Sequence, residues 1–457
     1  IAPRIVTVIG GANCEGEMGW ALRDQFPFLD YVCTGKSDWS FPALVEQILA
    51  GNPRPRIAGV VSRRDRSLTG VAPIGPAAGV LDELPYPDYD DFFVQFEASS
   101  VARHHQPYLP IETSRGCWWG AKHHCTFCGL NGDDMQYRSK SPARVIDEID
   151  YLESRHGPHE FQVVDNILDM KHIDSVLGRF AERARPPKLF YETKANLSKS
   201  QLRTLRRAGV YMIQPGVESL STPILQLMKK GVTGLQNVRL LKWCEEVGIN
   251  PAWNFLYGFP DEDPREYERI AGFIPSLVHL PPAWGIWIVD IHRFSPFHSE
   301  PQRHGFTKLR AGLAYRYVYP FPDTVLDRLA YFFDYERIDG RDADDYSAVA
   351  QAALVDWRSR YREASLRLSV DGQRVAIRDG RGPGVTEVVL EGPAARAYLA
   401  LDAGATAAAV QQRLGREAPD RRHLARLFDE WECAGYVLRE DDLYLGLAVN
   451  LDERICM

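Results

Sequence analysis

Three cysteines lie close together in the segment "RGCWWGAKHHCTFCGLNG", at Cys117, Cys125 and Cys128, while the remaining cysteines of the chain are scattered. Thiolates bind soft metal ions and iron–sulfur clusters. A cubane cluster needs four ligands, so three cysteines leave one iron open to a ligand that is not a side chain. An open iron can chelate a molecule through an amine and a carboxylate and pass it one electron. The spacing therefore predicts an iron–sulfur cluster that takes part in chemistry.

A structural zinc site is the alternative interpretation of this segment, with His123 or His124 as the fourth ligand. Trp118 and Trp119 would shield a cluster or simply pack against the loop. The motifs that follow the cysteines along the chain favour the cluster, because they match a catalytic scaffold independently of the cysteines.

The scaffold that positions the cysteine segment is predicted from residues 106–297, where strands and helices alternate. One helix begins at Ser141 as N-cap with Pro142 in its first turn. Six strand–helix units predict an α/β fold with a parallel, curved sheet and helices outside. Six strands are too few for a closed eight-stranded barrel, so we expect an open, partial (β/α)6 barrel with its chemistry at the carboxyl ends of the strands. The predicted strands lie in "LPIETSRG", "FQVVDN", "LFYETKA", "YMIQPGVE", "PAWNFLYGF" and "GIWIVDIHRF".

Further domains are predicted on both sides of this barrel. The front of the chain reads as α/β, with a strand in "RIVTVIGGAN" that ends in glycines, and it looks like the second half of a Rossmann-like domain whose first half precedes Ile1. The end of the chain combines a hairpin that turns at Asp371-Gly372, three short helices and a strand pair, which resembles a winged helix. The predicted boundaries are 1–80 for the front domain, 81–105 for a linker, 106–325 for the barrel, 326–364 for a helical connector and 365–457 for the C-terminal module.

Composition excludes several classes of protein. The net charge of −7 and the lack of a long basic run argue against a nucleic-acid partner. No apolar stretch reaches the length of a membrane span. The cysteines show no pairing pattern typical of a disulfide framework, so a cytoplasmic location is expected.

Three cysteines in a loop after the first strand of a partial barrel resemble the radical SAM superfamily. The usual spacing there is C-x3-C-x2-C, and this chain departs from it with seven residues in the first gap. The strings "YRSKSP", "VVDNILD", "ETKANL", "IQPGVESL" and "PAWNFLYGFP" are similar to those of a subgroup that matures ribosomally made peptides, in which the long gap is expected. The resemblance covers roughly residues 1–325.

The resemblance implies a [4Fe–4S] cluster bound by Cys117, Cys125 and Cys128, and S-adenosyl-L-methionine (SAM) as the molecule at the open iron. It implies reductive cleavage of SAM to a 5′-deoxyadenosyl radical, which takes a hydrogen from an unactivated carbon, with electrons from an external donor. Tyr257 is the candidate catalytic proton donor. The residues that the resemblance assigns to SAM are Phe127, Asp165, Asn166, Glu192, Lys194, Gln214, Glu218, Ser219 and Asn254.

The front segment resembles the second half of a cobalamin-binding domain, with Gly10 and Gly11 where the backbone approaches the ligand. A departure is "GKSD" at residues 35–38, where relatives often carry acidic residues. Cobalamin implies C-methylation, with a second SAM that restores the methyl group. The predicted function is therefore C-methylation of a precursor peptide. The rivals are cyclisation, cyclopropane formation, epimerisation or cross-linking, or a non-catalytic peptide-recruiting metalloprotein.

The C-terminal module has three interpretations: packing against the barrel, capture of a precursor peptide, or DNA binding. The strand in "DLYLGLAV" is a candidate edge for pairing with a leader peptide. DNA binding would use Arg421, Arg422 and Arg426, but nearby acidic residues cancel much of their charge.

Overall fold

The structure is a computed structural model that describes residues 5–63, 81–132, 135–157 and 159–455. The chain divides into two compact units, each of which draws on three segments. The first unit comprises Ile1–Asp91, Ser114–Arg144 and Asp290–Arg341, and the second comprises Phe92–Thr113, Val145–Val289 and Asp342–Met457. We describe each unit by itself.

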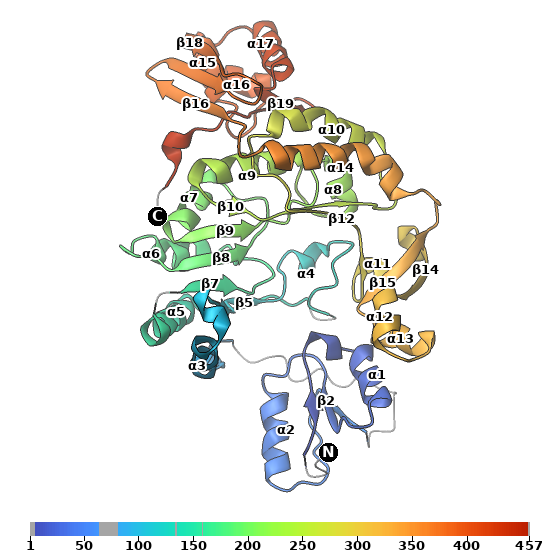
Figure 1. The fold of residues 1–457 in the computed structure, drawn as a ribbon. Coiled ribbons are helices and arrows are strands. Elements are labelled where there is room, and N and C mark those ends of the chain that lie inside the picture. Colours follow the sequence, from blue (N-terminus) through green and yellow to red (C-terminus); the bar gives the residue numbers. More distant parts are fainter. Residues whose placement is uncertain (1–4, 64–80, 133–134, 158, 456–457) are drawn as a thin grey trace. The chain divides into compact units, whose positions relative to one another are not determined.

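A parallel sheet forms the centre of the second unit (Figure 1). Its first five strands lie in the order β10-β9-β8-β7-β4 and all pair in parallel. A parallel bridge between Glu218 and Phe255 continues to the parallel pair β11–β12. The strands are β4 (Tyr108–Ile111), β7 (Glu160–Val163), β8 (Lys188–Glu192), β9 (Val210–Gln214), β10 (Asn250–Pro251), β11 (Asn254–Tyr257) and β12 (Gly285–Ile288).

Each strand predicted from the sequence is present, and the parallel pairing is confirmed. One difference is that the fifth predicted strand is divided into β10 and β11. The segment β10 pairs with β9 up to Pro251, and the N–H of the next residue, Ala252, still donates to the carbonyl of Ile213 in β9 at 2.8 Å. The chain then moves away from β9, and β11 pairs with β12. The split lets the sheet turn between its fourth and sixth strands.

Side chains of β11 alternate between two faces of the sheet. Phe255 is fully buried and packs edge-on against Tyr267 of the helix α10 (Arg265–Leu277), at 6.3 Å between ring centroids. Asn254 and Leu256 therefore face the other, open side of the sheet. The helices that follow the strands include α5 (Pro142–His156), α7 (Lys199–Arg207) and α9 (Gly234–Val247). Both α7 and α9 begin with a capping box, at Ser198 and Thr233, which fixes where each helix starts.

The C-terminal module belongs to the second unit. Its antiparallel sheet has the order β16-β17-β18, and the predicted hairpin is present, with Asp371 opposite Arg374. Three helices and a final hairpin follow, which agrees with the predicted order of elements. The elements are β16 (Leu366–Asp371), β17 (Arg374–Asp379), β18 (Thr386–Glu391), α15 (Gly392–Leu399), α16 (Ala407–Leu414), α17 (Arg421–Cys433), β19 (Val437–Glu440) and β20 (Leu443–Gly446).

A buried ion network joins this module to the helices α7 and α9. Lys242, only 3% exposed, lies 2.7 Å from a carboxylate oxygen of Asp402 in the module and 3.9 Å from Glu246. Lys199 lies 2.7 Å from Glu246 and 3.0 Å from Glu453 near the end of the chain. The module is therefore fixed to α7 and α9 by an ion network in which Lys242 and Glu246 are buried and the module's own carboxylates are partly exposed.

The first unit contains the front segment of the chain. The strands β1 (Val8–Ile9) and β2 (Tyr31–Cys33) pair in parallel, whereas β3 (Val60–Ser62), which was not predicted, pairs antiparallel with β2. The helices α1 (Glu17–Gln25) and α2 (Ser40–Leu49) accompany them. The small core of this segment contains Cys14, Leu29, Val32 and Val61.

The first unit also contains the cysteine segment and a second antiparallel sheet in the order β13-β15-β14. Its strands are β13 (Ile291–His292), β14 (Phe306–Ala311) and β15 (Phe332–Arg337). The segment 326–364, predicted to be helical, thus holds β15 as well as the helix α14 (Ala343–Arg360) of the second unit. Across the described residues, none of the helices is both long and apolar enough to span a bilayer.

Candidate functional site

The cysteine loop starts and ends at a short antiparallel pair. β5 (Ser114–Arg115) pairs with β6 (Arg138–Ser139), so the two ends of the loop meet. Gly116, directly before the first cysteine, has a φ of 87°, and a Cβ there would lie 2.3 Å from the carbonyl oxygen of Gln136. Glycine is therefore required at the entrance of the loop, because any side chain would clash with the returning strand.

The three thiols are partly exposed. Cys117, Cys125 and Cys128 form no disulfide within the described residues, and the backbone N–H of Gly120 donates to Sγ of Cys117 at 3.2 Å. Hydrogen bonds to sulfur are typical of protein iron–sulfur sites and tune their potential. A donor set of three thiols, one of them with an N–H···S bond, fits a cluster that takes one thiolate per iron.

His124 does not face the thiols as a free ligand. Its Nε2 lies 2.8 Å from the carbonyl oxygen of Cys128, so this nitrogen donates within the loop. His123 stacks on Trp119, with ring centroids 4.1 Å apart. In the part of the chain that the structure describes, no three His, Cys, Asp or Glu side chains converge closely enough to hold a single metal ion. The histidines thus have loop contacts that do not depend on zinc.

In the second unit, Asp165 lies after β7 and is 1% exposed. It accepts hydrogen bonds from the backbone N–H of Thr113, at 2.7 Å, and from the Thr113 hydroxyl. Thr113 follows β4 and immediately precedes the cysteine segment. Asp165 therefore ties the ends of β4 and β7 together.

Glu192 at the end of β8 is a carboxyl group with a strongly shifted pKa. Burial first, and then the nearby carboxylates of Glu218 and Asp165, raise its pKa from about 4.5 to about 7, while Lys230 opposes this shift. A carboxyl group with such a pKa is half protonated near neutral pH. Strongly shifted groups of this kind are typical of functional sites, particularly where like charges share a site. Thr193, the next residue, has a buried hydroxyl without a hydrogen-bond partner among the described residues.

Glu218 and Lys230 complete a charged group at the carboxyl ends of the strands. Glu218 has a φ of 57°, a left-handed conformation that is uncommon outside glycine, and Nζ of Lys230 lies 3.4 Å from its Oε1. Lys194 contacts the connection that contains Lys230, because its ammonium group donates to the backbone carbonyl of Lys230. Sequence reasoning did not identify Lys230, because it lies in the helix-to-helix connection "MKKGVT" and not at a strand end.

The other residues that the sequence assigns to SAM differ from one another in how exposed they are. Gln214 and Asn254 are exposed at the end of β9 and the start of β11, and Asn166 is partly buried after β7. Phe127 is partly exposed between two of the cysteines. Ser219 is fully buried, and its hydroxyl accepts from the backbone N–H of Ser221 at 3.2 Å, so it shapes the turn after Glu218.

Tyr257 lies on the helix-facing side of the sheet, opposite to Asn254. Its hydroxyl donates to Oδ1 of Asp344 in α14 at 2.6 Å. Burial and this carboxylate raise the pKa of Tyr257 to about 12. Side chains three positions apart on a strand face opposite ways. The placement therefore gives no support to a catalytic role for Tyr257, which stays a prediction.

In the front segment, Gly10 and Gly11 are exposed directly after β1. Gly11 has a φ of 101°, and a Cβ there would have no neighbour within 4 Å, which is consistent with an open surface at the strand end. Ser40, at the start of α2, has a buried hydroxyl without a partner among the described residues. Asp38 of the unusual "GKSD" segment forms an ion pair with Arg115 at 2.5 Å, beside the first cysteine.

Comparisons with known proteins agree with this site. Residues 111–274 match the family model described as the radical SAM superfamily. The chain is 26% identical over 282 residues to "Uncharacterized methyltransferase PH0819" of Pyrococcus horikoshii, covering 61% of this chain and 59% of that protein. It is also 26% identical over 287 residues to "Hopanoid C-3 methylase" of Methylococcus capsulatus, covering 61% of this chain and 52% of that protein. The chain thus spans between half and two thirds of these relatives.

A similar fold occurs in the solved structure of the "Cobalamin-dependent S-adenosylmethionine radical enzyme OxsB" with aqua-cobalamin and S-adenosylmethionine bound. The TM-score is 0.54 at 16% identity, and the match covers 78% of this chain and 54% of that chain. The parallel sheet, the cysteine loop and the matched segment imply a [4Fe–4S] cluster and SAM as cofactors. Residues 111–274 of the chain are thus similar to the radical SAM superfamily of enzymes.

Proposed function

We propose that the chain catalyses cobalamin-dependent C-methylation of an unactivated carbon in a ribosomally made precursor peptide. Relatives named as a methyltransferase and a methylase, together with the fold shared with a cobalamin-dependent enzyme, support methylation and cobalamin. The observation that carries the proposal is the three-thiol loop, and the charged group at the carboxyl ends of the parallel sheet in the second unit is a separate observation that agrees with it.

Cys117, Cys125 and Cys128 would hold the [4Fe–4S] cluster in this proposal. Bound there, the cluster and SAM supply radical chemistry that side chains alone cannot perform. Gly116 lets the loop leave β5 without a clash, and the N–H of Gly120 steadies the first thiolate. These two glycines therefore position the first of the three thiols, Cys117.

The charged group in the second unit would hold the amino-acid end of SAM. Glu192, Glu218 and Asp165 offer carboxylate acceptors for an ammonium group, and Lys194 and Lys230 offer donors for a carboxylate. The proton that Glu192 retains near neutral pH would leave when a cation binds beside it, because a positive charge favours the ionised carboxylate.

Gly10 and Gly11 would approach cobalamin in the front segment, where the backbone at Gly11 is open to a ligand. Cobalamin would supply the methyl group. An external reductase or ferredoxin-like donor would supply the electrons.

The sheet edge of the C-terminal module supports a peptide substrate. The edge expected from "DLYLGLAV" is already used, because Tyr444 of β20 exchanges backbone hydrogen bonds with Ala405 at 2.9 and 3.0 Å. The edge of β18 is different: within the described residues, no strand pairs with it on the side away from β17. Val385 and Val389 are 66% and 42% exposed there. An open edge with exposed β-branched residues suits strand addition by an extended peptide.

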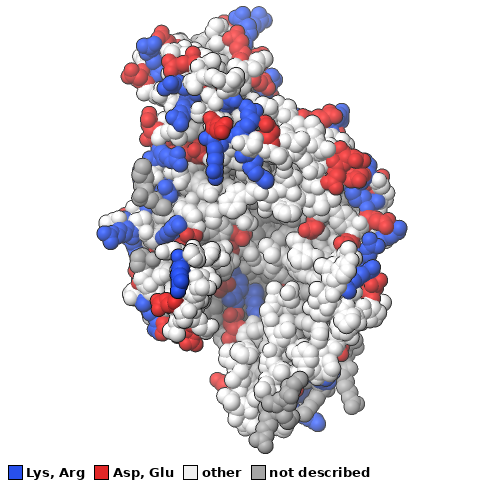
Figure 2. Space-filling view, in the orientation of Figure 1, with Lys and Arg blue, Asp and Glu red and all other residues white. Residues whose placement is uncertain are grey.

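The surface of the module does not favour nucleic acid. Figure 2 shows Lys and Arg side chains interspersed with Asp and Glu over the module on the visible face. Arg439, for example, lies 3.5 Å from Asp429 of α17. Phosphate backbones select surfaces with a concentrated positive charge, which this face does not have.

The test is mass spectrometry of the precursor peptide after anaerobic incubation with the reconstituted enzyme, SAM, cobalamin and a reductant. The expected result is a gain of one CH₂ unit together with S-adenosylhomocysteine and 5′-deoxyadenosine. A labelled leader should bind the wild type and bind V389K more weakly, because a lysine on a strand edge opposes pairing. A peptide that remains unmodified while another substrate gains the methyl group would refute the peptide assignment.

A second candidate is radical ring formation without methylation. Three relatives, among them one from Synechocystis at 23% identity over 311 residues, are named "Anaerobic magnesium-protoporphyrin IX monomethyl ester cyclase". Loss of a pair of hydrogens from the product, with no S-adenosylhomocysteine, would favour this candidate over methylation.

A further inference from the structure

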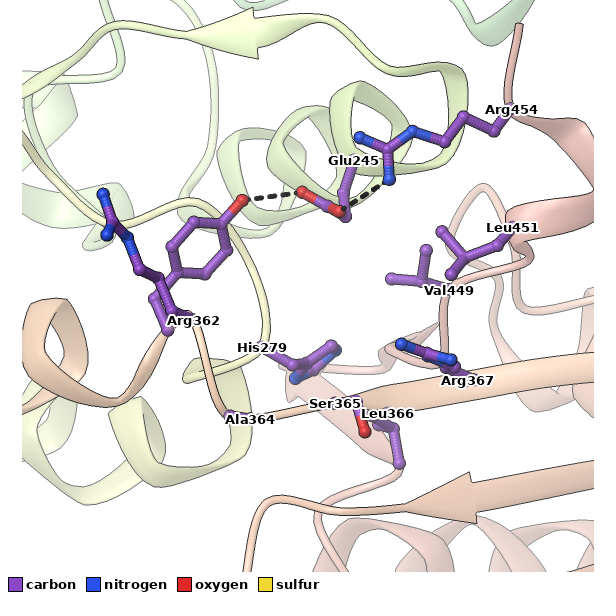
Figure 3. A pocket seen from close by; sticks show the side chains of 11 residues that line it. Glu245, His279, Arg362, Ala364, Ser365, Leu366, Arg367, Val449, Leu451 and Arg454 are labelled. Carbon is purple, nitrogen blue, oxygen red and sulfur yellow. Dashed lines mark hydrogen bonds and ion pairs between the residues drawn. The ribbon is translucent and has the colours of Figure 1, made fainter. Parts of the chain in front are cut away.

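A cavity of about 270 Å³ lies in the second unit, away from the strand ends, where α9, the end of α10 and the C-terminal module meet (Figure 3). Small-molecule sites are usually at or above this size, so the cavity suits a small ligand. None of the residues assigned to SAM or to the cluster lines it. Its walls come from four parts of the chain that are apart in sequence: α9 around Glu245, His279 after α10, residues 361–367, and residues 449–454.

The walls of this cavity are held in place by hydrogen bonds that do not involve a ligand. The hydroxyl of Tyr361 donates to Glu245 at 2.8 Å. Val449 and β16 exchange backbone hydrogen bonds, with the N–H of Leu368 donating to Val449 at 2.8 Å and the N–H of Val449 donating to Leu366 at 2.9 Å. The cavity is therefore formed in advance, which lowers the entropic cost of binding.

Positive charge exceeds negative charge around the cavity. Figure 3 shows Arg367 and Arg454 on the same side, with hydrophobic side chains between them, whereas Arg362 extends away on the opposite side. Arg454 lies 3.8 Å from Glu245, a long contact for an ion pair. Arg367 has no ion-pair partner among the described residues, and it is the second residue of β16, whose first residue, Leu366, also lines the cavity. In a chain with a net charge of −7, such a group is unusual.

The histidine in the wall does not add to this charge. His279 is 5% exposed, and burial, the largest cause, lowers its pKa to about 3, so the ring is neutral at physiological pH. Its Nε2 contacts the backbone carbonyl of Leu447 at 3.0 Å, which fixes the ring against the module. The electrostatics of the cavity therefore depend on the arginines and on Glu245.

We propose that this cavity binds a small ligand through an oxyanion group, a carboxylate or a phosphate, held by the guanidinium groups of Arg367 and Arg454. Guanidinium groups form paired, charge-assisted hydrogen bonds to both kinds of oxyanion. The hydrophobic side chains of Leu366, Val449 and Leu451 would contact the rest of the ligand. Glu245 limits affinity by competing for Arg454. This inference is independent of the proposed peptide substrate.

The test is isothermal titration calorimetry of the full, anaerobically reconstituted chain at low salt, with inorganic phosphate and succinate as separate probes. We expect at least one probe to bind with a Kd of about 0.1–1 mM. R367Q should weaken this binding by about fivefold or more, because it removes one charge, whereas E245Q should tighten it by about threefold. R422Q is the matched control, since Arg422 is exposed on α17 of the same module and does not line the cavity.

The opposite signs of the two variants separate ligand binding from a structural role. Glutamine at position 245 can still accept the hydrogen bond from Tyr361, so the wall is retained while the charge is lost. Preference for phosphate or for succinate identifies which oxyanion the site selects, and either preference supports the site. Absence of binding for both probes, equal weakening in R367Q and R422Q, or weaker binding in E245Q would overturn the proposal.

Discussion

Glu192 gives the sharpest test of the strand-end geometry, through the pH dependence of stability. Its pKa rises from about 4.5 to about 7 on folding, because burial and the neighbouring Glu218 and Asp165 disfavour its charge. Below pH 4.5 the carboxyl group is protonated in both the folded and the unfolded state, so it has no effect on stability. Between pH 4.5 and 7 the unfolded state ionises first, and the free energy of unfolding falls. Above pH 7 the cost of the charge is constant, at roughly 3 kcal/mol.

The variant E192Q keeps the shape of the side chain and removes the carboxyl group that titrates. We expect it to match the wild type near pH 4.5 and to exceed its free energy of unfolding by roughly 3 kcal/mol at pH 8. Urea unfolding of the cofactor-free chain, followed by fluorescence at several pH values, measures the difference. E268Q is the control, because Glu268 is exposed on α10. A difference between E192Q and the wild type that is independent of pH, or a wild type more stable than E192Q at pH 8, would refute the reasoning.

Three further substitutions test other parts of the structure. K242M should lower the free energy of unfolding by about 3 kcal/mol, because it leaves Lys199 as the remaining lysine beside the carboxylates of Glu246 and Asp402. Chemical denaturation measures this loss, and a loss below about 1 kcal/mol would contradict the network. G116A should reduce iron and sulfide content after reconstitution, because its Cβ would meet the returning strand; full cluster content would show that the loop adapts. Y257F should cleave SAM within about twofold of the wild-type rate, since its hydroxyl faces α14, and a loss of about 100-fold or more would restore the catalytic role.

The strands of the barrel could be predicted because each is a short apolar run that ends in polar residues. This pattern located Asp165, Glu192 and Glu218 at strand ends, and the structure places them within electrostatic reach of one another. The strand pattern could not locate Lys230, because this residue lies in a connection between helices and pairs with Glu218 from there. Nor could it fix which face of β11 each side chain occupies, because the split between β10 and β11 changes the register.

Other differences have similar causes. The antiparallel pairing of β3 depends on contacts between distant segments and has no signature within the strand itself. Ser219 is fully buried and comes directly after Glu218, which has a left-handed backbone conformation. No residue type in "IQPGVESL" predicts a left-handed conformation at Glu218. The sequence does not show that the edge of β20 is occupied, because its partner Ala405 lies outside any regular strand. Local patterns thus predicted elements well and long-range partners poorly.

The buried ions between α9 and the C-terminal module have a consequence for how this enzyme can be divided. A chain shortened to end before β16 would lose Asp402 and Glu453 and would expose Lys199 and Lys242 to new surroundings with a single shared counter-charge, Glu246. Cleavage before β16 would separate the lysines of α7 and α9 from the carboxylates of the C-terminal module that neutralise their charge. Attempts to exchange the module for that of another protein should therefore carry the matching face of α7 and α9 with it.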